Sequence, residues 1–146
     1  MSNAGGLGFV AAGYKTTDAL GEEIAATRAA TEEPFGVNVF AATPTEVSES
    51  ALDAYADSVR KDTSDTGVEP GDPRSDDDHF DAKCNLLLAD PVPVVSFTFG
   101  CPPVELVERF HGAGSEVWVT VTNVEEAEAA AEAGADALVA LSLIHI

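Results

Sequence analysis

Residues 92–99 read VPVVSFTF, and this run of β-branched and aromatic residues decides the fold class. An almost continuously apolar run, closed by Gly100, predicts a strand that is buried on both faces. Strands of that kind belong to parallel sheets, in which a helix crosses over between one strand and the next. We therefore expect helices on both sides of this segment.

The same alternation extends outward in both directions. Strands are expected at residues 8–12, 35–40, 92–99, 116–121 and 136–139, and helices at 18–30, 45–59, 78–88, 104–111 and 124–132. Alternating strands and helices predict an α/β fold with a parallel sheet. An eight-stranded βα barrel needs about 250 residues, and this chain has 146. The sequence thus predicts a partial TIM-type (β/α) barrel of about five parallel strands with outer helices.

Composition excludes several classes of protein. Seven Lys and Arg stand against 26 Asp and Glu, a net charge of −19. That charge argues against partners such as nucleic acid or an anionic membrane surface. No apolar window is long enough to span a bilayer, and the start of the chain lacks the features of a signal peptide. The two cysteines form no disulfide framework, so we expect a cytoplasmic protein.

One segment departs from the alternating pattern. Residues 61–78 read KDTSDTGVEPGDPRSDDD, with almost nothing apolar, and predict an acidic, mobile surface loop. The helix expected before it carries an apolar stripe along one face. The stripe consists of Val47, Ala51, Leu52, Tyr55 and Val59.

Four stretches resemble one enzyme family when they are taken together and in order. They are SNAGGLGFVAAGY at 2–14, PFGVNVF at 34–40, VSFTFGCP at 95–102 and GSEVWVTVTNVEEAEAAAEAGADALV at 114–139. They are similar to the nitronate monooxygenases, formerly called 2-nitropropane dioxygenases, which are FMN-dependent βα barrels. The resemblance implies flavin-dependent oxidation of alkyl nitronates with O₂ to a carbonyl compound and nitrite. The substrate would then be a small molecule and the cofactor FMN.

The resemblance points to candidate cofactor residues. Asn38 matches an asparagine that hydrogen-bonds the flavin in the family, and a side-chain amide suits the mixed donor and acceptor edge of the ring. Without the resemblance, pairing with loop backbone is the more frequent role of such an asparagine. Gly5 and Gly6 leave the backbone open either to a ligand or to a tight turn. Ser96 and Thr98 either border the substrate side of the flavin or simply fit the barrel interior.

The two ends of the chain differ from the family pattern. The barrel domain is expected at residues 1–139, and residues 140–146 do not resemble the family. The family's catalytic histidine, in a Gly-Gly-His loop, would lie beyond this C-terminus, so we assign no catalytic residue. We expect a truncated chain that binds FMN weakly or not at all, does not turn over a nitronate and self-associates through open barrel edges. A flavin-dependent NAD(P)H reductase on the same barrel and a non-catalytic gene fragment remain alternatives.

Other reactive side chains have plainer explanations. Cys101 precedes a helix start, where a thiolate is stabilised, but it has no histidine partner, which favours an inert thiol. The acidic run 76–81 with His79 offers ligands for a hard cation, although a solvated helix start explains it better. His111 suits a helix C-terminus, and His145 falls in the divergent tail.

Overall fold

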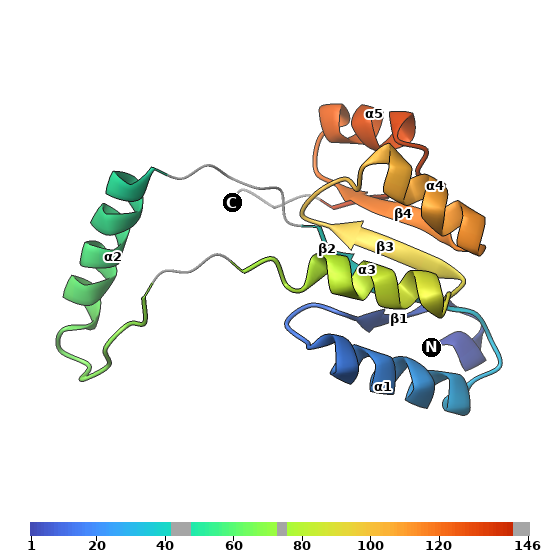
Figure 1. Cartoon of the computed structure of the whole chain (residues 1–146), viewed down its shortest axis with the longest axis horizontal. Coiled ribbons are helices and arrows are strands. Elements are labelled where there is room, and N and C mark those ends of the chain that lie inside the picture. The colour runs from blue at the N-terminus through green and yellow to red at the C-terminus, as the bar shows by residue number, and fades with distance from the viewer. Residues whose placement is uncertain (42–47, 73–75, 142–146) are drawn as a thin grey trace. The chain divides into compact units, whose positions relative to one another are not determined.

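Five strands form one parallel sheet in sequential order, as the sequence predicts (Figure 1). The computed structural model describes residues 1–41, 48–72 and 76–141. The strands are β1 (Gly8–Ala11), β2 (Phe35–Phe40), β3 (Val94–Thr98), β4 (Glu116–Val121) and β5 (Ala137–Ala140). Every neighbouring pair is parallel, so all five carboxyl ends meet at one edge of the sheet. The prediction of a partial βα barrel with about five parallel strands is confirmed.

Four helices pack on one face of the sheet (Figure 1). They are α1 (Thr17–Ala30), α3 (Phe80–Ala89), α4 (Val104–Ala113) and α5 (Val124–Glu132), and a short 3₁₀ helix, η1 (Ser2–Ala4), precedes β1. Polar caps fix where two of them begin. The Thr16 hydroxyl accepts the Ala19 N–H, and the Asn123 side chain accepts the Glu126 N–H.

The core lies between these helices and the sheet. Alternate strand residues point toward the helices, so Val37, Val95 and Val119 are almost fully buried. Leu20 of α1, Leu87 of α3 and Phe110 of α4 meet them from the helix side. Burial of such side chains contributes about 1.5–3 kcal/mol each.

The opposite face of the sheet carries large side chains with partial exposure. Phe9 and Trp118 lie with their ring centroids 5.7 Å apart. A Cβ placed on Gly36 would come within 2.3 Å of the Phe9 ring, so the ring fits over this glycine. The absence of a side chain at residue 36 therefore makes room for the aromatic pair.

Residues Pro44–Asp76 form a separate compact unit, and Met1–Thr43 with Asp77–Ile146 form the other. The smaller unit contains α2 (Glu49–Thr63), which starts after the predicted residue 45 because the Ser48 hydroxyl caps it. Part of the predicted acidic loop, 61–63, is thus helical, and residues 73–75 lie outside the described residues. Two residues of the apolar stripe, Leu52 and Tyr55, are exposed. Val47 lies outside the described residues.

The start of α3 also differs from the sequence prediction. The helix begins at Phe80 rather than at residue 78, because Asp78 and His79 adopt left-handed backbone angles. Within the described ranges, no helix is long and apolar enough to cross a membrane.

Candidate functional site

Hydroxyl and amide side chains form a polar band across the open face of the sheet. Asn38 of β2 lies opposite Ser96 of β3 in the strand register. The Ser96 hydroxyl donates to Asn38 Oδ1 at 2.8 Å, and the Thr98 hydroxyl donates to the same oxygen at 2.9 Å. Thr98 Oγ1 is 3.3 Å from Thr120 Oγ1 of β4. Three neighbouring strands therefore hold one connected hydrogen-bond network.

An aromatic row lies at the carboxyl ends of the first three strands. Tyr14 meets Phe40 edge-on at 5.4 Å between ring centroids, and Phe40 meets Phe99 at 4.9 Å. Tyr14 and Phe99 are 92% and 67% exposed, and both have left-handed φ angles, 60° and 75°. Such angles are rare for bulky residues and cost of order 1–3 kcal/mol each. Backbone strain of this kind concentrates at functional sites.

A buried ion pair contacts the backbone of Tyr14 in this row. Lys83 of α3 is fully buried, and its Nζ is 2.8 Å from Asp78 Oδ2. The other carboxylate oxygen of Asp78 accepts the Tyr14 N–H at 2.8 Å. The pair thereby connects α3 to the strained turn that follows β1.

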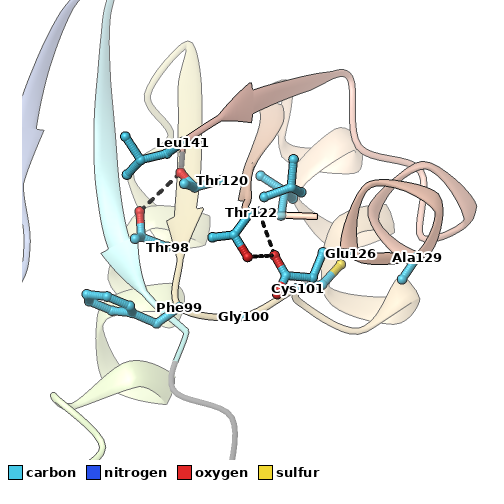
Figure 2. A pocket seen from close by; sticks show the side chains of 11 residues that line it. Thr98, Phe99, Gly100, Cys101, Thr120, Thr122, Glu126, Ala129 and Leu141 are labelled. Atoms are coloured by element: carbon cyan, nitrogen blue, oxygen red, sulfur yellow. Dashed lines mark hydrogen bonds between the residues drawn. The ribbon is translucent and has the colours of Figure 1, made fainter. Parts of the chain in front are cut away.

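A cavity of about 410 Å³ opens at the carboxyl ends of β3 and β4 (Figure 2). Its walls come from the strand ends, the loop with Gly100 and Cys101, and the first turns of α5. In Figure 2 the hydroxyls of Thr98 and Thr120 point toward one another, and Glu126 faces Thr122. The lining residues are Thr98, Phe99, Gly100, Cys101, Val119, Thr120, Val121, Thr122, Glu126, Ala129 and Leu141.

Glu126 is the one acidic side chain among the described residues of the cavity wall, and it already accepts hydrogen bonds. Glu126 Oε2 accepts the Thr122 N–H at 2.7 Å and the Thr122 hydroxyl at 3.0 Å. These bonds, the backbone one first, lower the pKa of the Glu126 carboxyl. Glu126 is therefore ionised at neutral pH and serves the start of α5. Burial raises the pKa of the Cys101 thiol, which agrees with an inert rather than an activated cysteine.

The structure does not bring Gly5 and Gly6 together with Asn38. Both glycines precede β1, at the amino-terminal edge of the sheet. Gly5 has a left-handed φ of 84° and ends η1 with a hydrogen bond to Ser2 O. A Cβ on Gly6 would meet the Met1 side chain at 3.1 Å. The tight turn accounts for Gly5, and cofactor binding by either glycine stays a prediction.

The remaining candidate residues from the sequence are the histidines and the acidic run near His79. His111 Nε2 is 2.8 Å from Asp136 Oδ2, so this histidine ties α4 to the start of β5. Across residues 1–41, 48–72 and 76–141, no three potential metal ligands come together, and those near His79 are no exception. His145 lies outside the described residues.

Comparison with known proteins decides the family. The nitronate monooxygenase family matches residues 1–142 of this chain. The chain belongs to the nitronate monooxygenase family.

Individual relatives agree with this assignment. A probable nitronate monooxygenase of Staphylococcus haemolyticus is 36% identical over 143 residues, and one of Staphylococcus aureus strain Newman is 34% identical. Each match covers 96% of this chain and 40% of the relative, so the chain spans less than half of their length.

Solved structures show the same relation. The nitroalkane oxidase from Streptomyces ansochromogenes is 48% identical with a TM-score of 0.85, over 95% of this chain and 40% of that one. FabK from Thermotoga maritima is 26% identical with a TM-score of 0.67, over 95% of this chain and 33% of that one. The partial barrel is thus a nitronate monooxygenase fold segment.

Sequence reasoning about this nitronate monooxygenase segment missed several residues of the site. Thr120, Tyr14 and Phe40 join it through strand register and ring contacts that join distant parts of the chain. One signal was available for Thr120, because it alternates with Trp118 on the same strand as Ser96 and Thr98 do on theirs. Nothing in the sequence marked Lys83 as buried.

Proposed function

We propose that this chain forms one wall of a flavin site in an enzyme that oxidises alkyl nitronates with O₂ to a carbonyl compound and nitrite. The observation that carries the proposal is the family match over residues 1–142. The 48% identity to a nitroalkane oxidase supports the same chemistry. The substrate is accordingly a small nitronate, and we propose FMN as the flavin and Asn38 as a residue that contacts it.

The described residues suit the ring of a flavin better than its phosphate. Asn38 offers an amide on the open face, and the exposed rings of Tyr14 and Phe99 offer flat apolar surface beside it. Among the described residues, the cavity wall holds no lysine or arginine, and the charged group there, Glu126, is an anion. A phosphate would therefore gain nothing from these eleven residues, whereas an uncharged ring system fits them.

The chain's own residues act by positioning rather than by proton transfer. FMN, when bound, supplies the redox chemistry of the reaction. Asn38 would hold the edge of the ring through its amide, and the aromatic row would offer the ring apolar surface. His111 is not available as a base on the open face of the sheet. It lies in α4, on the helix side, and its Nε2 contacts Asp136 Oδ2. We assign the role of catalytic base to none of the described residues.

A reductase is the second candidate. The similarity to FabK, at a TM-score of 0.67, covers the same 95% of this chain. A flavin-dependent NAD(P)H reductase would use the same ring-facing wall. Oxidation of NAD(P)H without nitrite release would favour this alternative.

We also propose a cytoplasmic location, with residues 1–139 as the barrel domain and 140–146 apart from it. β1 and β5 are the outer strands of the sheet, and each presents one edge without a strand neighbour among the described residues. Such edges pair readily with another chain. Self-association of this chain through them is therefore our expectation, and light scattering over a range of salt concentrations measures it.

A titration with two flavins tests the proposed site. The purified chain is titrated with FMN and with riboflavin, which lacks the phosphate, and flavin fluorescence is followed. We expect weak, saturable binding of both with Kd values within about threefold, because the site reads the ring. Asn38→Ala should weaken both by about three- to tenfold, since one net hydrogen bond contributes about 0.5–1.5 kcal/mol. No saturable binding, or binding indifferent to residue 38, would refute the site, and nitrite release from nitroethane measures turnover separately.

A further inference from the structure

The amide of Asn38 is oriented by its neighbours. Its oxygen already accepts two hydrogen bonds, from the Ser96 hydroxyl at 2.8 Å and from the Thr98 hydroxyl at 2.9 Å. A carbonyl oxygen has two lone pairs, so both are in use. The amide nitrogen makes no hydrogen bond to any residue in the described part of the chain. Only the donor half of the side chain is therefore available to a ligand.

The hydroxyls form a chain with a definite direction. Each hydroxyl has a single proton, and Thr98 gives its proton to Asn38. The contact of 3.3 Å between the hydroxyls of Thr98 and Thr120 must then run from Thr120 to Thr98. Protons thus point from β4 through β3 to the Asn38 oxygen on β2. Hydrogen bonds in such a chain polarise one another and become stronger.

Burial adds to the hold on the amide. Ser96 is 5% exposed, and Asn38 and Thr98 are half-buried on the same face. Turning the amide over would place its N–H₂ against the Thr98 hydroxyl, whose proton already faces it. Thr98 could then donate to Thr120 instead, but the proton of the buried Ser96 hydroxyl would have no acceptor among the described residues, and an unsatisfied buried donor is costly. The arrangement therefore favours one orientation.

We infer that Ser96 and Thr98 are positioning residues that hold Asn38 with its N–H₂ group toward the flavin, so that the site selects a hydrogen-bond acceptor on the ring. The acceptor is a ring carbonyl oxygen or an unprotonated ring nitrogen, and the ring's own N–H group is excluded. This inference rests on the proposed function. The sequence alone allowed the Asn38 amide either to donate to the ring or to accept from it, and the inference keeps only the donor role.

The first experiment examines the chain without ligand. The sequence contains four asparagines and no glutamine, so a ¹⁵N–¹H correlation spectrum shows four side-chain N–H₂ pairs. Asn38→Asp identifies the pair of residue 38. In the double variant S96A/T98V we expect that pair to broaden or shift as the amide loses its fixed rotamer, while the other three stay. The single variants S96A and T98V each keep one hydrogen bond and should give intermediate shifts.

Two variants serve as controls for that spectrum. Ser115→Ala removes another buried hydroxyl, which donates to Val92 O at 2.7 Å near the amino-terminal edge of the sheet. It should leave the Asn38 pair in place. Thr120→Val leaves the proton of Thr98 on Asn38 and should shift the pair less than T98V does. If the N–H₂ signals of Asn38 are the same in S96A/T98V as in wild type, Ser96 and Thr98 do not position Asn38.

The second experiment asks which half of the amide the ligand meets. Riboflavin should move only the Asn38 pair among the four. Asn38→Asp keeps an oxygen for both hydroxyls but replaces the donor with a negative oxygen, so riboflavin binding should weaken at least about tenfold at pH 7. S96A/T98V should weaken it less. Unchanged binding by N38D would show that the ligand meets the oxygen, and the inference would be wrong.

The two experiments separate this inference from the proposed function. If wild-type chain fails to bind riboflavin, the proposed flavin site is wrong, whereas the ligand-free spectra still decide whether the hydroxyls position Asn38. If riboflavin binds and moves the Asn38 pair, the comparison of N38D with wild type decides the orientation.

Discussion

Replacing Asp78 with Asn should destabilise the fold far more than an ordinary surface substitution. The substitution keeps a side-chain oxygen for the Tyr14 N–H, which Asp78 accepts at 2.8 Å. It removes the negative charge that stands 2.8 Å from Lys83 Nζ. The Lys83 side chain is 0% exposed, so its ammonium group would remain in the interior without a counter-charge.

The expected size of the effect follows from that burial. Removing one partner of a buried ion pair costs about 3–5 kcal/mol, because the remaining charge is uncompensated. Lys83→Met leaves the Asp78 carboxylate, whose side chain is 15% exposed, so the cost should be smaller, about 1–2 kcal/mol. The double variant D78N/K83M leaves no buried charge and should recover most of the stability lost in D78N.

Urea unfolding followed by fluorescence measures these differences. Trp118 is the sole tryptophan and lies in the sheet beside Phe9, so its emission reports on the folded state. With an m-value of about 2 kcal/mol/M, D78N should lower the urea midpoint by about 2 M. Asp81→Asn, an exposed acid in the same helix, is the control and should change stability by less than about 0.5 kcal/mol. A D78N midpoint close to that of D81N would refute the reasoning.

Three further predictions concern other parts of the sheet. Burial alone would raise the pKa of Asp136, but hydrogen bonds from the Val117 N–H and His111 outweigh it and lower the pKa. The stabilising contribution of Asp136 should be complete above about pH 4, the pKa of the unfolded chain, and should disappear as the pH falls through the lowered pKa of the folded chain. The free energies of unfolding of wild type and D136N, compared from pH 2 to 7, should therefore converge only at the acid end. Burial first, then the Asp81 charge, raises the pKa of Cys84 to about 12, so a thiol reagent at pH 8 should label Cys101 in the folded chain and both cysteines in urea. Gly36→Ala should displace the Phe9 ring and change tryptophan emission, because the added Cβ would lie 2.3 Å from that ring; unchanged emission would contradict the packing described.

Local patterns were enough to predict the strands. Residues 92–99 and 116–121 are rich in β-branched and aromatic side chains, and β3 and β4 fall within these ranges. The start of α2 was mispredicted, because the Ser48 hydroxyl accepts the Ala51 N–H and the helix begins at Glu49 rather than at residue 45. The sequence also shows the apolar stripe of this helix, but a stripe alone does not say whether another surface covers it.

The site was predictable only in part. Alternation along β3 places Ser96 and Thr98 on one face, as the sequence shows. Their meeting with Asn38 depends on strand register, which joins residues 58 positions apart and leaves no local signal. The left-handed angles of Tyr14 and Phe99 run against the preference of bulky residues, so no propensity predicts them. Burial of Lys83 likewise depends on a carboxylate from the preceding turn.

β2 and β3 are paired strands joined by a longer segment of chain than the pair β3 and β4. Asn38 and Ser96 meet across 58 residues, whereas Thr98 and Thr120 meet across 22. Closing the longer loop costs about 1 kcal/mol more in chain entropy, so the β3–β4–β5 part should assemble first during folding and the β1–β2 part should dock onto it. Since the intervening residues Pro44–Asp76 form a unit of their own, a cut within them gives two fragments joined by the β2–β3 ladder. The hydrogen bonds from Ser96 and Thr98 to Asn38 cross that ladder. When the two fragments bind each other, these bonds form again, and the side-chain N–H₂ signal of Asn38 reports the association.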